Sequence, residues 1–239
     1  MLTGARQTGK TTLCRSMFPD YVFLSIEDPV LRGQYAQLPA SRWRDLYPRA
    51  ILDEVQKEPR LIESIKSVYD QWPEPRYVLT GSSQLLLMEK VRESLAGRCV
   101  ILELYPLTLP ELMTRGDKDE VPLSPFLRLV QDPAKVPELL PSFLLDPDYS
   151  RKQDAWDHYT MFGAYPALTD ADLDADDRFE WLGNYVKTYL ERDIRDLASF
   201  RDLDAFTKIQ RWPAPETATV TKAASIAHQG GIRAKTAPR

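Results

Sequence analysis

Short apolar runs alternate with segments of helical periodicity along the first half of the chain. The runs are residues 21–26, 49–54, 77–80 and 99–104. Each is rich in residues that favour strands, and each ends at a proline, a glycine or a polar residue. Between them apolar residues recur at helical spacing, most clearly from Leu61 to Trp72. Asp28 before Pro29, and the capping-box pattern from Thr108 to Glu111, each predict the start of a helix. Strands that alternate with helices predict an α/β fold with a parallel sheet flanked by helices.

The second half of the chain has a different pattern. Prolines interrupt residues 116–150, which predicts a loop-rich insertion or linker. A helix is expected over 151–162, then a turn, and a long amphipathic helix from about Asp177 to Ile209. The acidic run at 170–177 is expected to stand at the start of this helix. The composition of the last residues predicts disorder. The expected domains are a core at 1–115, the linker at 116–150, a helical lid or start of a C-terminal domain at 151–211, and a disordered or aberrant tail at 212–239.

A glycine-rich loop stands close to the first residue. Gly4 to Thr11 reads G-x-x-x-x-G-K-T, the pattern of a phosphate-binding loop. Glycines allow a backbone that offers successive N–H groups to phosphate oxygens, and Lys10 adds a positive charge. The Thr11 hydroxyl is a hard oxygen ligand suited to Mg²⁺. The residues expected to bind the nucleotide are Gly4, Ala5, Arg6, Gln7, Thr8, Gly9, Lys10, Thr11 and Thr12.

Two adjacent carboxylates follow the apolar run at 49–52. Asp53 stands at the expected C-terminal end of a strand, where ligands gather in open α/β sheets, so it is predicted to hold Mg²⁺ together with Thr11. Glu54 is predicted to orient or deprotonate a water that attacks the γ-phosphate. A salt bridge at the strand end is the alternative interpretation of the pair, and the loop at this spacing favours the metal and water roles.

Two further residues are candidates for catalysis. Ser82 follows the run at 77–80, where its hydroxyl could bond the γ-phosphate or the attacking water. The equal alternative is that this hydroxyl caps a helix. Arg98 is a candidate to stabilise phosphate charge in this subunit or in a neighbour's site, with a surface ion pair as the equal alternative.

Composition narrows the class of protein. The 239 residues carry a net charge of −4 and are 43% hydrophobic, which is ordinary for a globular protein and gives no bulk attraction to nucleic acid. No apolar run approaches the roughly 20 residues that cross a bilayer. Cys14 and Cys99 make neither a disulfide framework nor a metal pattern. We therefore expect a cytoplasmic protein that does not contact membranes and shows no sign of binding nucleic acid.

Five stretches together resemble a prokaryotic family of AAA-type P-loop ATPases whose members carry a C-terminal domain of unknown function. They are residues 2–12, 51–56, 79–83, 94–98 and 105–112. The helical residues 185–201 are also similar to that family. The resemblance spans about residues 2–211 and implies a P-loop NTPase fold of the AAA/ASCE type. It further implies ATP binding, a Walker B role for Asp53 and Glu54, a sensor role for Ser82, and the strand order 5-1-4-3-2.

The chain departs from the family pattern at its two ends. The strand expected before Gly4 is almost absent, and the residues after Arg211 resemble nothing in the family's C-terminal domain. These departures predict a chain truncated at both ends, with the central strand lost and sheet edges exposed.

Three functions remain open from the sequence. The first is ATP hydrolysis with Mg²⁺, coupled to conformational change in an unidentified protein partner or in a homo-oligomer. The second is a non-hydrolysing nucleotide-binding remnant or switch, which the departures at the ends favour. The third is a P-loop kinase of a small molecule, which the acidic pair disfavours because it points to water as the nucleophile.

Overall fold

The computed structural model describes residues 1–81, 91, 93–114, 119–135, 146 and 148–190. It divides the chain into two compact units, Met1–Gly183 and Asn184–Arg239. Almost all of the second unit lies outside the described residues, including the predicted tail at 212–239 and the predicted helix beyond residue 190. The fold below is that of the first unit, followed by the elements at residues 184–190, the described part of the second.

Three parallel strands form the larger part of the sheet. They are β2 (Val22–Ser25), β3 (Arg49–Asp53) and β4 (Arg76–Leu79), in the order β2-β3-β4. Val22 pairs with Ala50, and the register continues to Ser25 opposite Asp53. Four of the five β3 residues are buried, as expected of a central parallel strand.

A short strand joins this sheet to its other edge. β1 (Leu2–Thr3) pairs in parallel with β5 (Leu102–Glu103). On its other side Leu2 forms a parallel bridge to Thr80, and the Gly81 amide donates to the Leu2 carbonyl at 3.3 Å. The strands therefore follow the order β5-β1-β4-β3-β2, which confirms the order that the resemblance implied. The prediction that the central strand is lost was wrong: β1 is short, but it has neighbours on both sides.

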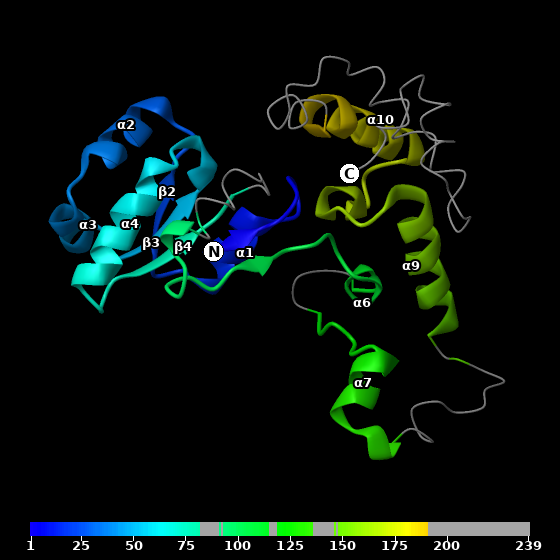
Figure 1. Ribbon diagram of the computed structural model, residues 1–239. Helices are drawn as coiled ribbons and strands as arrows, with labels where there is room; N and C mark the ends of the chain where they lie inside the picture. The colour runs from blue at the N-terminus through cyan, green and yellow to red at the C-terminus, as the bar shows by residue number, and fades with distance from the viewer. Residues whose placement is uncertain (82–90, 92, 115–118, 136–145, 147, 191–239) are drawn as a thin grey trace, which may run out of the picture. The chain divides into compact units, whose positions relative to one another are not determined.

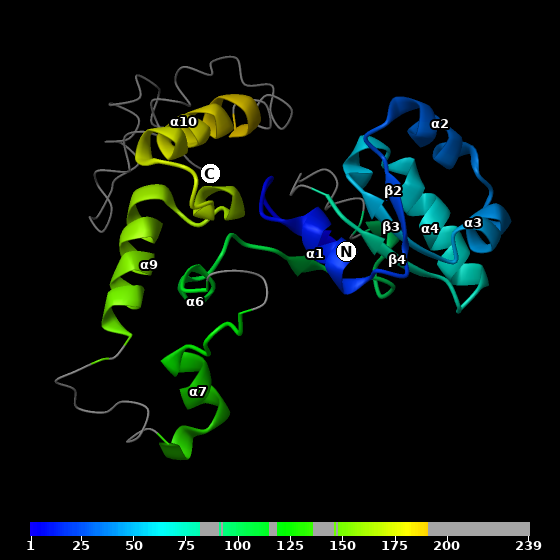
Figure 2. The same ribbon diagram turned by 180° about the vertical axis from the view of Figure 1, so that it is seen from behind.

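Helices cover the β2-β3-β4 sheet. Those near it are α1 (Lys10–Met17), α2 (Pro29–Gln37), α3 (Ala40–Leu46), the 3₁₀ turn η1 (Val55–Lys57) and α4 (Arg60–Gln71). In Figures 1 and 2 α4 runs beside both α2 and α3. Asp28 caps α2 by accepting from the amides of Val30 and Leu31, as predicted. The core between sheet and helices includes Trp43, which is fully buried.

The chain after the sheet adds one short helix that was predicted and one that was not. α6 (Leu109–Leu112) begins with the predicted capping box, in which Thr108 and Glu111 bond each other's backbone. α7 (Pro125–Gln131) lies inside the predicted linker, where Ser124 caps it and Pro125 fits the first helical position. β5 is shorter than the predicted strand at 99–104 because its partner β1 offers only two residues for pairing.

The remaining described elements are helical. They are η2 (Pro133–Lys135), α9 (Tyr149–Phe162), η3 (Pro166–Thr169), α10 (Ala175–Tyr185) and the π-helical turn η4 (Val186–Leu190). Gly163 ends α9 with φ 78°, a backbone that glycine adopts without strain. The acidic residues that the sequence predicts at a helix start do stand there, since Asp176 and Asp177 lie in the first turn of α10.

Candidate functional site

The glycine-rich loop connects β1 to α1 through a backbone with positive φ at three residues. Gly4 has φ 140°, Gln7 has φ 64° and Gly9 has φ 90°. A side-chain carbon on Gly4 would collide with the carbonyl oxygen of Leu104, so this position requires glycine for packing as well as for conformation. Gly9 stands at the N-cap of α1 and its carbonyl accepts from the Leu13 amide at 2.9 Å. The remaining N–H groups at this helix start are suited to bind an anion.

Lys10 points back into the loop. Its Nζ donates to the carbonyls of Gly4 at 3.1 Å and Ala5 at 2.6 Å, and only 6% of the residue is exposed. Burial lowers the pKa of Lys10 below its ordinary value, an effect that the charges of Glu54 and Asp53 oppose. A buried ammonium held by neutral carbonyls is an unsatisfied charge, so the loop is prepared to receive negative charge.

Asp53 is held between two hydroxyls. Thr11, the second residue of α1, donates to the two carboxylate oxygens at 3.1 and 3.0 Å, and the Thr80 hydroxyl donates to one of them. Asp53 is the last residue of β3, and its own carbonyl accepts from the Ile26 amide at 3.0 Å. The fold therefore brings the loop residue and the strand-end carboxylate together, although they are far apart in sequence. A hydroxyl and a carboxylate in contact are oxygen ligands of the kind that Mg²⁺ takes.

Glu54 leaves the strand in a left-handed conformation, with φ 60° and ψ 42°. The next amide, Val55 N–H, donates to the Thr80 carbonyl at 3.0 Å, and the Val55 side chain is fully buried. These contacts hold a backbone that residues other than glycine rarely adopt. The Glu54 carboxylate accepts a hydrogen bond from Nε2 of Gln56. Its negative charge acts on Lys10, so both carboxylates lie in the electrostatic surroundings of the loop.

The other two predicted catalytic residues are not part of this cluster. Ser82 lies outside the described residues, and so does its neighbour Ser83. Arg98 forms an ion pair with Asp70 of α4, with Nε 2.6 Å from Oδ1, and this contact raises the pKa of Arg98. Within this chain Arg98 adopts the surface ion pair that was its alternative interpretation. A role in a neighbour's site stays a prediction.

Three residues of the site were not found by sequence reasoning. Thr80 bonds Asp53, Gln56 bonds Glu54, and Pro166 borders the loop, since a side-chain carbon on Gly9 would lie 3.9 Å from its Cγ. Gln56 stands only two residues after the predicted acid pair, so its spacing was a usable signal. Thr80 and Pro166 reach the site through the tertiary fold, and Thr80 was visible only as the end of a predicted strand.

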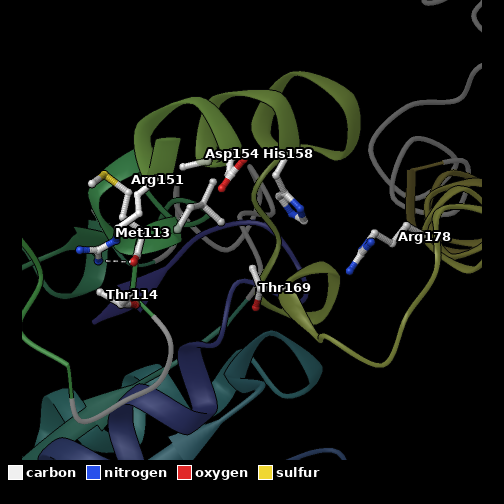
Figure 3. A pocket seen from close by; sticks show the side chains of 9 residues that line it. Met113, Thr114, Arg151, Asp154, His158, Thr169 and Arg178 are labelled. Atoms are coloured by element: carbon white, nitrogen blue, oxygen red, sulfur yellow. Dashed lines mark hydrogen bonds between the residues drawn. The ribbon is translucent and has the colours of Figure 1, made fainter. Parts of the chain in front are cut away.

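A separate hollow of about 330 Å³ lies between the end of α6, α9, η3 and α10. Figure 3 shows Asp154 and His158 of α9 and Arg178 of α10 around it, with Arg151 bonded to the Met113 carbonyl at 2.8 Å. Arg178 donates to the carbonyls of Leu168 and Asp170. The loop residues do not line this hollow. The cluster around Lys10, Thr11 and Asp53 is therefore the candidate site.

Comparisons with known proteins match both ends of the chain. Residues 1–113 match the model of a family described as AAA domain, and residues 153–239 match the model of a domain of unknown function. The second match continues through 212–239, the predicted tail. An uncharacterized protein of Mycobacterium bovis and one of Mycobacterium tuberculosis are each 34% identical over 116 residues, which is 47% of this chain. The chain spans about a quarter (26%) of the length of these relatives.

A solved structure of the Aeropyrum pernix Orc1 protein in complex with DNA is 16% identical, and the alignment covers 96% of this chain and 70% of that one. Its TM-score of 0.31 is too low to support a statement about this chain. None of the helices within the described ranges has the length and apolar character that a membrane crossing needs. The loop and the parallel sheet lie within the part of the chain that the family model matches: residues 1–113 are similar to the AAA domain family and are called the AAA-type domain below.

Proposed function

We propose that this chain binds ATP with Mg²⁺ and hydrolyses it, and that hydrolysis drives a conformational change in a protein partner. The observation that carries the proposal is the contact between Thr11 at the start of α1 and Asp53 at the end of β3. This contact joins the anion-binding loop to the carboxylate pair, and hydrolysis of a triphosphate needs the two together.

The loop fits a triphosphate in both shape and charge. The glycine conformations at Gly4 and Gly9 expose backbone N–H groups, and α1 begins at the loop. Lys10 is buried and donates to the neutral carbonyls of Gly4 and Ala5, so phosphate oxygens would be stronger partners for its charge. The nucleotide would be held by residues 4–12.

Thr11 and Asp53 would hold Mg²⁺. The described residues contain no group of three or more His, Cys, Asp or Glu side chains that could bind a metal without help. Mg²⁺ does not require such a group, because it is commonly bound through one or two carboxylates and the substrate phosphates. When bound, the metal would neutralise charge on the β- and γ-phosphate oxygens.

Glu54 is the proposed base. It would accept a proton from a water while that water attacks the γ-phosphorus and the bond from this phosphorus to the bridging oxygen of ADP breaks. The partner and any role of Arg98 in a neighbouring subunit are part of the same proposal. The AAA-domain match supports nucleotide binding, and the hydrolytic step rests on the carboxylate geometry.

The test is phosphate release from Mg-ATP by the wild type and by Glu54→Gln, together with the affinity for a fluorescent ATP analogue. We expect Glu54→Gln to bind the analogue normally and to hydrolyse ATP at least a hundredfold more slowly. Glu74→Gln is the matched control because Glu74 is exposed on the loop before β4. Equal rates for Glu54→Gln and the wild type would remove Glu54 from its role. Tight binding without hydrolysis by the wild type would instead support a non-hydrolysing switch.

A further inference from the structure

Gln56 follows the acid pair and turns its side chain back toward it. Nε2 of Gln56 donates a hydrogen bond to Oε2 of Glu54. Gln56 is partly buried, in the 3₁₀ turn η1 that begins directly after Glu54. An amide donor on a carboxylate restricts the orientation of that carboxylate, and a charge-assisted bond is stronger than a neutral one.

The backbone explains why a residue two positions away can make this contact. The left-handed conformation of Glu54 reverses the chain at the end of β3. Bonds on both sides fix this reversal: the Asp53 carbonyl accepts from Ile26, and the Val55 amide donates to the Thr80 carbonyl. The Lys57 amide donates to the Glu54 carbonyl at 3.0 Å and closes the turn. The turn therefore presents Gln56 to Glu54 from a backbone that is itself held to β2 and β4.

The strained backbone of Glu54 is a further sign that its contact with Gln56 serves a function. Only two residues other than glycine have positive φ in the described part of the chain, Gln7 in the loop and Glu54. A left-handed conformation is sterically unfavourable for such residues and persists where surrounding contacts impose it. Both strained residues belong to the candidate site. The fold therefore holds the backbone of Glu54 in an unfavourable conformation at the site, and Gln56 fixes its side chain.

We propose that Gln56 is a positioning residue that holds the Glu54 carboxylate in the orientation required to accept a proton from the attacking water. The proposal rests on the proposed function. A carboxylate has about four acceptor positions, so one bond from the Gln56 amide leaves Glu54 able to accept from water. Without the bond, Glu54 samples several side-chain rotamers, and only some of them direct the carboxylate toward the γ-phosphate.

The test replaces the amide donor while the length of the side chain is kept. Gln56→Met removes the donor, and Gln56→Glu keeps the shape but places a second negative charge against Glu54. We expect kcat for ATP hydrolysis to fall about tenfold in Gln56→Met and further in Gln56→Glu, because a hydrogen bond to a charged group is lost. KM and the affinity for the ATP analogue should stay within twofold of the wild type. Gln56→Asn keeps an amide on a shorter chain and should recover part of the rate.

Two comparisons separate positioning from a general structural role. Gln71→Met, on α4, removes a glutamine amide that bonds Ser67 and should leave kcat unchanged. In the Glu54→Gln background, Gln56→Met should cause no further loss, because the residue acts through Glu54. A fall in kcat that persists in that background would overturn the inference, and so would a fall matched by lower affinity and a lower melting temperature.

The outcomes also distinguish this inference from the proposed function. If the wild type hydrolyses ATP and Gln56→Met has the same kcat, the inference is overturned and the proposed function stands. If the wild type releases no phosphate under any condition, the proposed function fails and the role of Gln56 fails with it. If Gln56→Met does not fold, the Gln56→Asn and Gln56→Glu variants decide by the same criteria.

Discussion

The AAA-type domain and the helical residues at 119–183 bury different kinds of side chain. Polar or charged residues are buried around the loop of the AAA-type domain: they are Thr3, Thr8, Lys10, Asp53 and Thr80. The buried residues of the helical part are apolar, and its large aromatic side chains include several that are about half exposed, such as Trp156 and Phe179. Burial of a polar group costs free energy unless the group has a hydrogen-bond partner. A cluster of buried polar side chains is therefore typical of a functional site.

The difference teaches where substitutions should matter. Near the loop each polar side chain has a specific partner, such as Thr11 and Thr80 for Asp53, and its loss leaves another group unpaired. In the helical part the polar side chains are mostly exposed, and water replaces a lost partner. We expect the effects of substitution to decrease from the loop toward the helices, and four variants test this order.

Lys10→Ala should have the largest effect. Charge-assisted bonds to phosphate are worth about 1.5–3 kcal/mol each, so we expect the affinity for an ATP analogue to fall about a hundredfold. Fluorescence titration measures this change. Lys66→Ala, on α4, is the control and should bind as the wild type does. Unchanged affinity in Lys10→Ala would show that the loop does not bind the triphosphate.

Thr80→Val should come next, as an effect on stability. Valine keeps the shape of threonine but cannot donate to Asp53, so a buried carboxylate loses one of its two hydroxyl partners. We expect the free energy of unfolding in urea to fall by about 1–3 kcal/mol. Thr80→Ser keeps the hydroxyl and should lose less. If serine destabilises the protein and valine does not, the methyl packing of Thr80 is what matters, and not its hydroxyl.

Glu54→Gly should be more stable than Glu54→Ala, although both variants should abolish hydrolysis. Glycine adopts the backbone of Glu54, with φ 60°, without a steric cost. Glu54→Ala removes the same carboxylate but keeps the strain, so the difference between the two variants isolates the backbone. We expect the glycine variant to be more stable than the alanine variant by about 1 kcal/mol, measured by urea unfolding. The opposite order would mean that Glu54 is not strained.

His158→Gln should have the smallest effect, visible only in its pH dependence. Burial, and then the positive charge of Arg178, lower the pKa of His158 below 6.5. The unfolded chain therefore binds a proton before the folded chain does as pH falls, so His158 makes stability decline from pH 7 toward pH 5. The variant should reduce that decline in melting temperature. An equal decline in the variant and the wild type would exclude His158 as its source.

Prediction from sequence succeeded where the signal is local. The loop pattern, the run that became β3 and the capping box at Thr108 all depend on neighbouring residues, and each forms as predicted. Contacts across the fold could not be predicted. The pairing of Arg98 with Asp70 and the contact between Thr80 and Asp53 join separate elements, so no spacing in the sequence reveals them.

The predicted loss of the central strand failed for a related reason. A strand of two residues carries almost no periodic signal, and β1 exists because β5 and Thr80 supply partners from elsewhere in the chain. The helix α7 was also missed, since prolines suggested a linker while Ser124 and Pro125 instead provide a helix start.

The shortness of β1 divides the sheet into two blocks, β1 with β5 and β2 with β3 and β4. The ladders among β2, β3 and β4 extend over four residue pairs on each side of β3, whereas the seam between β1 and β4 is a single bridge. The glycine-rich loop follows β1, in the smaller block, and the carboxylate pair stands at the end of β3, in the larger one. Amide hydrogens along the seam should therefore exchange with solvent sooner than those of β3. A ligand that contacts both the loop and the carboxylates would connect the two blocks, so its binding should slow exchange at the seam.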